Sequence, residues 1–123
     1  MVELELQQSR DIWENAFFTG NYEVLAHYEH RSFKVIYEQE GRVEANYTRY
    51  DRIAHAVQNG VWKPRNPDIM FEEFNFNRDG TLCHILVGLK EGARLIRESW
   101  LYEQGWKISE LRFLKPSDSD LLK

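Results

Sequence analysis

The sequence has little cysteine and proline, no long hydrophobic run and no surplus of positive charge. Cys83 is the single cysteine among 123 residues, so neither an internal disulfide nor a zinc site built on several cysteines can form. No apolar run approaches the roughly 20 residues that span a bilayer, and the N-terminus lacks the basic-then-apolar order of a signal peptide. Sixteen Lys and Arg against 20 Asp and Glu give a net charge of −4, which argues against nucleic-acid binding. We therefore expect a soluble cytoplasmic protein without a membrane or nucleic-acid partner.

Aromatic residues, by contrast, are abundant. Four Trp, six Tyr and seven Phe make up 14% of the chain. Burying so many large apolar groups can offset the entropy lost on folding. The composition predicts one ordered domain over residues 1–115, followed by a polar tail over 116–123. Because a core of this size does not need all of these rings, we also expect an aromatic-lined cavity or a contact surface.

The N-terminal half has the periodicity of three amphipathic helices. The first carries Trp13 on its apolar stripe and ends at Gly20, a residue suited to a left-handed helix end. Asn21 is a typical N-cap for a short second helix. Thr48 and Asp51 have the spacing of a capping box, which predicts the start of a third helix.

The rest of the chain is predicted to form strands. Two short strands, over 33–38 and 42–45, precede the third helix. Four longer ones follow it, over about 68–77, 81–90, 94–103 and 106–114, separated by Asp79-Gly80, Glu91-Gly92 and Gln104-Gly105. Each separator is typical of a two-residue hairpin turn. The predicted fold class is α+β, with three N-terminal helices packed in a strongly curved, mostly antiparallel sheet.

Counting outward from these turns assigns each strand residue to one face of the sheet, because a slip of one residue turns every side chain over. One face is apolar and has to be covered by the helices; it consists of Met70, Phe74, Phe76, Cys83, Ile85, Val87, Leu89, Ile96, Trp100, Leu111 and Phe113. The opposite face is mixed and suits either solvent or a dimer interface, with Phe71, His84, Arg97, Leu101 and Trp106 as candidate contacts. Since twofold pairing is the commonest oligomer, we expect a homodimer. Changes of phase in the apolar pattern predict β-bulges near Glu72-Glu73 and Ser109-Glu110, and Glu72 is expected in solvent.

The element order resembles the nuclear transport factor 2-like superfamily. The resemblance covers Leu4 to Leu114, and its most telling stretches are Trp13 to Phe33 and the segment WLYEQGWKI from Trp100 to Ile108. The second stretch is similar to the small polyketide-cyclase-like and ketosteroid-isomerase-like branches. The resemblance implies a cystatin-like cone, in which a curved sheet wraps around helices and leaves a pocket at the wide end. It implies little about activity, because the superfamily includes isomerases, dehydratases, hydrolases and non-catalytic domains.

Glu98 is the main anomaly on the apolar face. Its predicted row places it among Phe74, Ile85 and Leu111, where a carboxylate has to be partnered, solvated in a cavity or raised in pKa. A carboxyl of raised pKa could act as a general acid or base. The alternative is that Glu98 pairs with an Arg or His from a helix, or that a register slip exposes it.

Other candidate site residues have weaker signals. Tyr37 lies near the end of the first strand, where the resemblance implies a catalytic Asp, so it is either a ligand-orienting phenol or a pocket-lining aromatic. Trp62 is either a residue that covers the mouth of the pocket or a residue of the hydrophobic core. His27 and His30 lack a third ligand, so no metal site is expected. Gly-rich phosphate loops and nucleophile elbows are absent from the sequence, and no cofactor is expected.

Two functions follow from these observations. The first is binding of a small apolar ligand in a pocket lined by Trp62, Phe74, Phe76, Ile85, Trp100, Leu111 and Phe113. It extends to cofactor-independent isomerisation, cyclisation or dehydration, with Glu98 as acid or base and Tyr37 orienting the ligand. The alternative is a non-catalytic module that forms a homodimer or binds a partner through the mixed face. Pairing of Glu98 with an arginine, without an open cavity, would exclude the enzyme.

Overall fold

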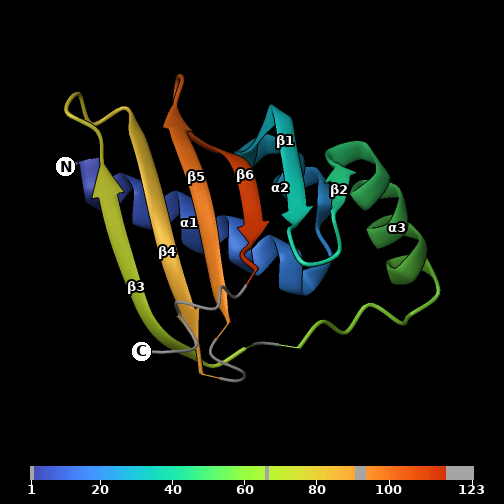
Figure 1. Ribbon diagram of the computed structural model, residues 1–123. Helices are drawn as coiled ribbons and strands as arrows, with labels where there is room; N and C mark the ends of the chain where they lie inside the picture. The colour runs from blue at the N-terminus through green and yellow to red at the C-terminus, as the bar shows by residue number, and fades with distance from the viewer. Residues whose placement is uncertain (1, 66, 91–93, 116–123) are drawn as a thin grey trace.

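A computed structural model describes residues 2–65, 67–90 and 94–115 of the chain. The helices are α1 (Val2–Thr19), α2 (Tyr22–Tyr28) and α3 (Asn46–Gln58); the strands are β1 (Glu29–Tyr37), β2 (Arg42–Ala45), β3 (Ile69–Phe76), β4 (Leu82–Leu89), β5 (Leu95–Tyr102) and β6 (Trp106–Phe113). The strands form a six-stranded sheet in the order β2-β1-β6-β5-β4-β3, in which β1 runs parallel to β6 and the other pairs are antiparallel. The predicted α+β class, with three helices and a curved sheet, is confirmed (Figure 1).

Local sequence signals mark some element boundaries and miss others. Gly20 has a φ of +75° after α1, and Asn21 accepts a hydrogen bond from the backbone N–H of Val24 at 3.3 Å, as an N-cap does. The capping box predicted at Thr48 does not form, because α3 begins at Asn46 after Ala45, which offers no capping side chain. The first strand starts earlier than residue 33, at Glu29, so His30 lies on β1 rather than on a helix. This extension pairs with β6, a tertiary contact without a local signal.

The register predicted from the turns is confirmed over the middle of the sheet. Phe74 lies opposite Ile85, Ile85 opposite Glu98, and Glu98 opposite Leu111. Every member of the predicted apolar face except Met70 is buried in the core or packed against it. Met70 is 62% exposed because β3 carries an extra residue between Ile69 and Phe71. The bulge predicted near Glu72-Glu73 therefore lies two residues earlier.

The β5–β6 hairpin corrects the prediction for two large residues. Tyr102 pairs with Trp106, so the turn has three residues instead of two, and Trp106 and Ile108 face inward. They are 3% and 0% exposed, so the placement of Trp106 on the dimer face is wrong. Ser109 is an extra residue in β6, and this bulge restores the predicted register beyond it. The two deviations cancel, which is why Leu111 and Glu98 pair as predicted.

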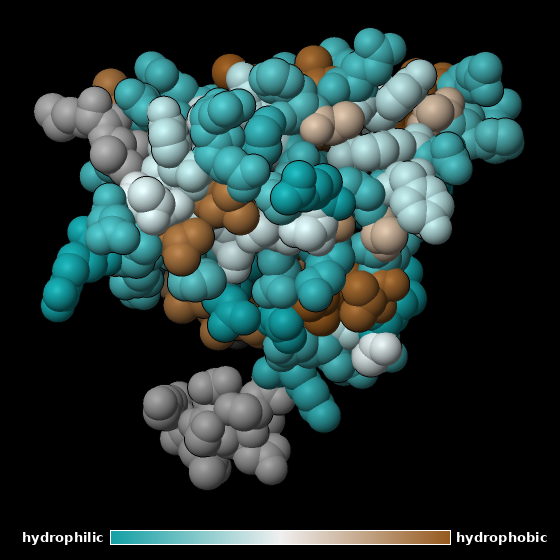
Figure 2. Space-filling view, turned by 90° about the horizontal axis from the view of Figure 1, so that it is seen from above, coloured by the Kyte–Doolittle hydropathy of each residue, from teal (hydrophilic) through white to brown (hydrophobic). Residues whose placement is uncertain are grey.

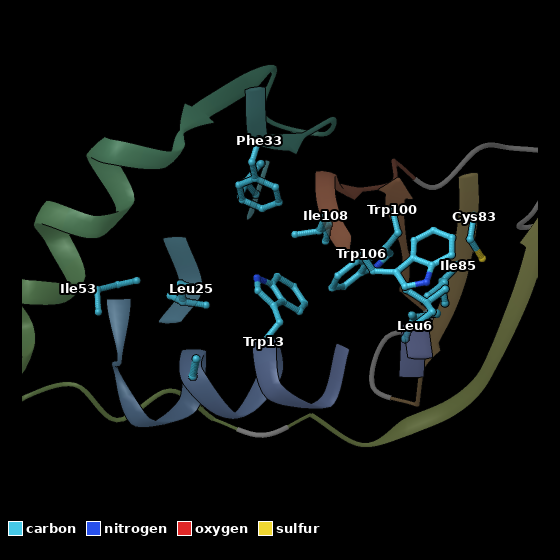
Figure 3. Packing of buried hydrophobic residues seen from close by; sticks show 13 residues of the cluster. Leu6, Trp13, Leu25, Phe33, Ile53, Cys83, Ile85, Trp100, Trp106 and Ile108 are labelled. Atoms are coloured by element: carbon cyan, nitrogen blue, oxygen red, sulfur yellow. The ribbon is translucent and has the colours of Figure 1, made fainter. Parts of the chain in front are cut away.

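The core lies between α1 and the inner face of the sheet. Trp13 of α1 meets Trp100 of β5 edge to face, with ring centroids 5.8 Å apart, and Figure 3 shows both indoles at the centre of the packed side chains. Leu6, Ile85 and Trp100 are at most 1% exposed. Buried aromatic and aliphatic surface of this kind is the main favourable term in folding.

The outer face of the sheet carries none of the described helices (Figure 1). On it, the ring of Phe71 lies so close over Gly88 that a Cβ there would be 2.1 Å from the ring. Figure 2 shows the end of the molecule with the β3–β4 and β5–β6 turns, where hydrophilic side chains dominate and hydrophobic ones form small separate groups. No helix among the described residues is long and apolar enough to cross a membrane.

Candidate functional site

The buried carboxylate of Glu98 is held by an arginine from α1. Arg10 donates from Nε to Oε1 and from Nη2 to Oε2 of Glu98, both at 2.7 Å. The two side chains are 7% and 5% exposed. Trp100 Nε1 donates a third hydrogen bond to Oε1 at 2.8 Å. Paired hydrogen bonds from a guanidinium are an effective way to compensate a buried carboxylate. The structure therefore shows the arginine-paired alternative for Glu98.

Two further carboxylates reach the same guanidinium. Glu72 lies 2.6 Å from Nη1 of Arg10 and Glu14 lies 3.4 Å from Nη2. Glu72, expected in solvent, thus turns toward Arg10 with 30% of its side chain exposed. Burial works against the charged guanidinium, but the hydrogen bond and charge of Glu98 outweigh it and raise the pKa of Arg10. Burial raises the pKa of Glu14; the charge of Arg10 opposes this shift, and the charges of Glu98 and Glu72 add to it.

This cluster has the features of a structural ion network. All three hydrogen bonds to Glu98 come from groups that stay protonated, a guanidinium and an indole. A general acid or base has to reach the reacting group directly or through one water. Glu98 as a whole is 4% exposed, and it does not line the pocket described below. Its surroundings therefore argue against a role for Glu98 in proton transfer.

A second buried carboxylate, absent from the sequence-based candidates, joins three elements. Glu29 of β1 accepts hydrogen bonds from Trp13 Nε1 at 2.9 Å, Arg49 Nη1 at 3.0 Å and Tyr50 Oη at 2.6 Å. Burial and the bond to Glu29 raise the pKa of Tyr50. Because the donors come from α1 and α3, this carboxylate ties both helices to the sheet.

A pocket of about 670 Å³ opens at the rim of the sheet, where β1 and β6 end and β5 begins. In Figure 1 it lies at the end toward which the arrowheads of β1 and β6 point. We call it the rim pocket; it is lined by Tyr37, Glu38, Gln39, Glu40, Arg94, Leu95, Phe113 and Leu114. Its volume lies within the range of about 300–1,000 Å³ that is usual for small-molecule sites.

An aromatic pair forms part of the pocket wall. The rings of Tyr37 and Phe113 are stacked, with centroids 5.0 Å apart and an interplanar angle of 2°. The guanidinium of Arg42 lies 4.1 Å from the centroid of Tyr37. The Tyr37 hydroxyl donates to Glu44 at 3.0 Å, and burial together with this bond raises the pKa of Tyr37. Tyr37 therefore lines a pocket, while its hydroxyl proton is engaged by the protein itself.

The charged groups of the rim pocket differ in how they are compensated. Glu38 accepts hydrogen bonds from the backbone N–H of Lys115 at 2.9 Å and from Arg112 at 2.8 Å, and these bonds lower its pKa. Glu40 pairs with Arg42 at 2.9 Å. The exposed side chain of Arg94 makes no hydrogen bond or ion pair within the described part of the chain.

The other predicted ligand contacts lie elsewhere. Phe113 is the member of that set that lines the rim pocket. Phe74, Phe76, Ile85, Trp100 and Leu111 pack in or against the core. Trp62 donates from Nε1 to the carbonyl oxygen of Phe17 at 2.7 Å and packs edge to face on that ring, so it closes the end of α1.

The predicted outer-face residues other than Trp106 do lie on the outer face. His84 Nδ1 is 2.9 Å from the hydroxyl of Ser99, and Leu101 lies opposite the 46%-exposed Leu82. The Nε atom of Arg97 is buried without a hydrogen-bond partner among the described residues. Among the residues that the structure describes, no group of three or more His, Cys, Asp or Glu is placed to hold a metal ion.

The search among solved structures returns proteins with this architecture. An NTF2-like protein of unknown function in nutrient uptake from Rhodospirillum rubrum superimposes with a TM-score of 0.68 at 14% identity, covering 89% of this chain and 98% of its own. The chain has the NTF2-like fold. A Shewanella frigidimarina protein provisionally named a ketosteroid isomerase superimposes on the chain with a TM-score of 0.64 at 12% identity, covering 92% of this chain and 97% of its own.

The cystatin-like description also applies to neighbours of this NTF2-like fold. A Nostoc punctiforme domain of unknown function with a cystatin-like fold has a TM-score of 0.62 at 18% identity, covering 98% of this chain and 81% of its own. No family model and no curated protein sequence matches the chain. At these identities the likeness concerns the fold, and function has to be argued from the site.

Proposed function

We propose that the protein binds a small molecule in the rim pocket. The observation that carries the proposal is a pocket of about 670 Å³ whose wall combines the stacked rings of Tyr37 and Phe113 with the leucines Leu95 and Leu114. Concave sites of this size, with apolar walls and a few polar groups, are the usual form of a ligand site. The NTF2-like fold is compatible with this role, since it forms a concave sheet around helices.

The lining supports a ligand that is apolar over one part and polar over another. Tyr37, Phe113 and the two leucines offer apolar surface, while Gln39 and Arg94 offer hydrogen-bond donors. The proposal therefore adds a polar part to the small, largely apolar ligand expected from the sequence. Binding without turnover is favoured because Glu98 is held by Arg10 and Trp100.

The proposal is tested by a binding screen on the full chain. Ligand-observed NMR with neutral, aryl-substituted alcohols and amides identifies binders, and calorimetry gives their affinities. Leu95→Ala removes apolar wall from the pocket and is expected to weaken binding about tenfold, in line with the loss of one buried leucine contact.

Leu4→Ala is the matched control, because Leu4 is a 56%-exposed leucine of α1 outside the rim pocket and away from the outer face of the sheet. Its affinities should equal those of the unchanged protein. An absence of binding across the screen, or equal losses in the two variants, would rule out the rim pocket as a ligand site.

A second candidate function, self-association through the outer face, has its own support. Leu82 and Phe71 are 46% and 37% exposed on that face, and the side chain of Arg97 is 41% exposed there. A second copy of the chain could cover the leucine and the phenylalanine and supply an acceptor for Arg97.

A further inference from the structure

The rim pocket contains one cation that the rest of the described protein does not neutralise. Arg94 directly precedes β5, lines the pocket and is exposed. Its backbone is fixed, because its carbonyl oxygen accepts a hydrogen bond from the N–H of Leu89 at 2.8 Å. The guanidinium itself makes no ion pair within the described residues, so that part of the chain leaves its donors unengaged.

The acidic groups around the pocket, by contrast, are already matched. Ion pairs join the carboxylates of Glu38, Glu40, Glu44 and Glu110 to the guanidiniums of Arg42, Arg52, Arg97 and Arg112. The charges of these two sets balance one another. What remains at the pocket is the positive charge of Arg94 beside the Tyr37–Phe113 wall.

We propose that the rim pocket selects small organic anions, with an apolar body against Phe113, Leu95 and Leu114 and an anionic head on Arg94. This inference rests on the proposed ligand-binding function and names the chemical class of the ligand. A guanidinium presents a planar set of donors that fits a carboxylate or a phosphate with two parallel hydrogen bonds. A cationic head, in turn, would meet carboxylates that are already paired with arginines.

The test compares ligands that share one body and differ in the head. The probes are 4-phenylbutanoate, 4-phenylbutyl phosphate, 4-phenylbutanamide, 4-phenylbutan-1-ol and 4-phenylbutylamine, titrated calorimetrically into the full chain. At least one of the two anions is expected to bind about tenfold more tightly than the amide and the alcohol, because charge-assisted hydrogen bonds are about twice as strong as neutral ones. The pair of anions shows whether carboxylate or phosphate is the better head.

Variants connect the preference to Arg94. Arg94→Gln should abolish the preference for the anion and leave the affinity for the alcohol unchanged, whereas Arg94→Lys should retain part of it. Arg78→Gln is the matched control, because Arg78 is exposed in the β3–β4 turn, outside the pocket lining. Its anion preference should equal that of the unchanged protein.

The outcomes separate this inference from the proposed function. If the alcohol and the amide bind as tightly as the anions, or if Arg94→Gln keeps the preference, the anion selectivity is wrong and the pocket still stands. Tighter binding of the amine also overturns the inference. If none of the five probes binds, the rim pocket fails as a site for this class and the inference fails with it.

Discussion

Arg10 lies on the same stripe of α1 as Leu6 and Trp13, so the helix carries a guanidinium into the interior where β5 presents Glu98. The spacing of three and four residues between these positions is the signal that could have identified the partner of Glu98 from the sequence. The inward facing of Glu98 could be predicted, because turns and register fix it. The side chain that reaches it from a helix could not be derived from the strands alone.

The Arg10–Glu98 pair is expected to matter for stability. Glu98→Gln leaves Arg10 without its main partner and should lower the free energy of unfolding by about 3–5 kcal/mol. The double variant Arg10→Met with Glu98→Leu should cost less than the single one, because it removes both buried charges. Urea denaturation followed by circular dichroism measures both. Glu103→Gln, at a side chain that is 56% exposed, is the control. A Glu98→Gln protein as stable as the control would contradict the structural role.

Glu14 should show the opposite behaviour. Its pKa is raised above 4.5 by burial and by neighbouring carboxylates, so the folded protein binds this proton more tightly than the unfolded chain. The stabilisation from the protonated form is present below the unfolded value and is lost as the pH rises through the folded one. Glu14→Gln should therefore raise stability at pH 7, by less than about 1 kcal/mol because the side chain is 34% exposed.

The comparison across pH is the measurement that checks the role of Glu14. Thermal unfolding of the two proteins should differ at pH 7 and converge near pH 4. A Glu14→Gln protein less stable than the unchanged one at pH 7 would mean that the contact with Arg10 at 3.4 Å outweighs the repulsion.

At the scale of elements, the hairpins show what turn chemistry can and cannot predict. Gln104 has a φ of +57°, a left-handed conformation that is uncommon for glutamine and is not predicted from the residue type. This conformation allows the three-residue turn of the β5–β6 hairpin. Together with the bulge at Ser109 it places Trp106 and Ile108 in the core. The phase change in β6 indicated the bulge. The turn length could not be predicted, because Gln-Gly suits either length.

The corner between α1 and α2 depends on a glycine for two separate reasons. Gly20 has a φ of +75°, and a Cβ there would lie 2.5 Å from Val57 Cγ2 and 2.8 Å from Trp62 Cδ1. Gly41, in the β1–β2 turn, has a φ of +63° and open space around it. Gly41→Ala should cost about 1–2 kcal/mol from backbone strain alone.

Gly20→Ala should cost at least about 2 kcal/mol, because packing against α3 and Trp62 adds to the strain. Chemical denaturation of both variants gives the difference. Equal losses in the two variants would show that Val57 and Trp62 move aside without cost. Partial loss of the contact between Trp62 and the Phe17 carbonyl should accompany the larger effect.

At the scale of the whole molecule, self-association through the outer face can be tested by measuring the mass of the particle in solution. If a second copy covers this face, size-exclusion chromatography with light scattering should give a particle of twice the 14.7 kDa chain mass. Leu82→Asp should convert it to the single-chain mass. Tyr47→Asp, on the 68%-exposed tyrosine of α3, should not. A single-chain mass for the unchanged protein at high concentration would refute self-association.

The rim pocket shows where prediction from the sequence reaches its limit. Its lining comes from the last residues of β1 and β6, the β1–β2 turn and the residues around the start of β5. Phe113 was among the sequence-based candidates because its face of the sheet could be counted from the turns, and Tyr37 because of its position in the family that the sequence resembles. Gln39, Arg94 and Leu114 lie beyond the strand ends, where alternation no longer assigns a direction, so tertiary structure was needed to bring them together.

The positions of the tryptophans make the intrinsic fluorescence sensitive to unfolding but not to ligand binding at the rim pocket. Trp13 and Trp100 donate to buried carboxylates and Trp62 donates to a backbone carbonyl, so their emission depends on the integrity of the interior. The rim pocket, however, has no indole in its lining. Unfolding should therefore change the intrinsic fluorescence strongly, whereas a ligand at the rim should leave it almost unchanged. Fluorescence screens that rely on tryptophan quenching would miss every ligand that binds there.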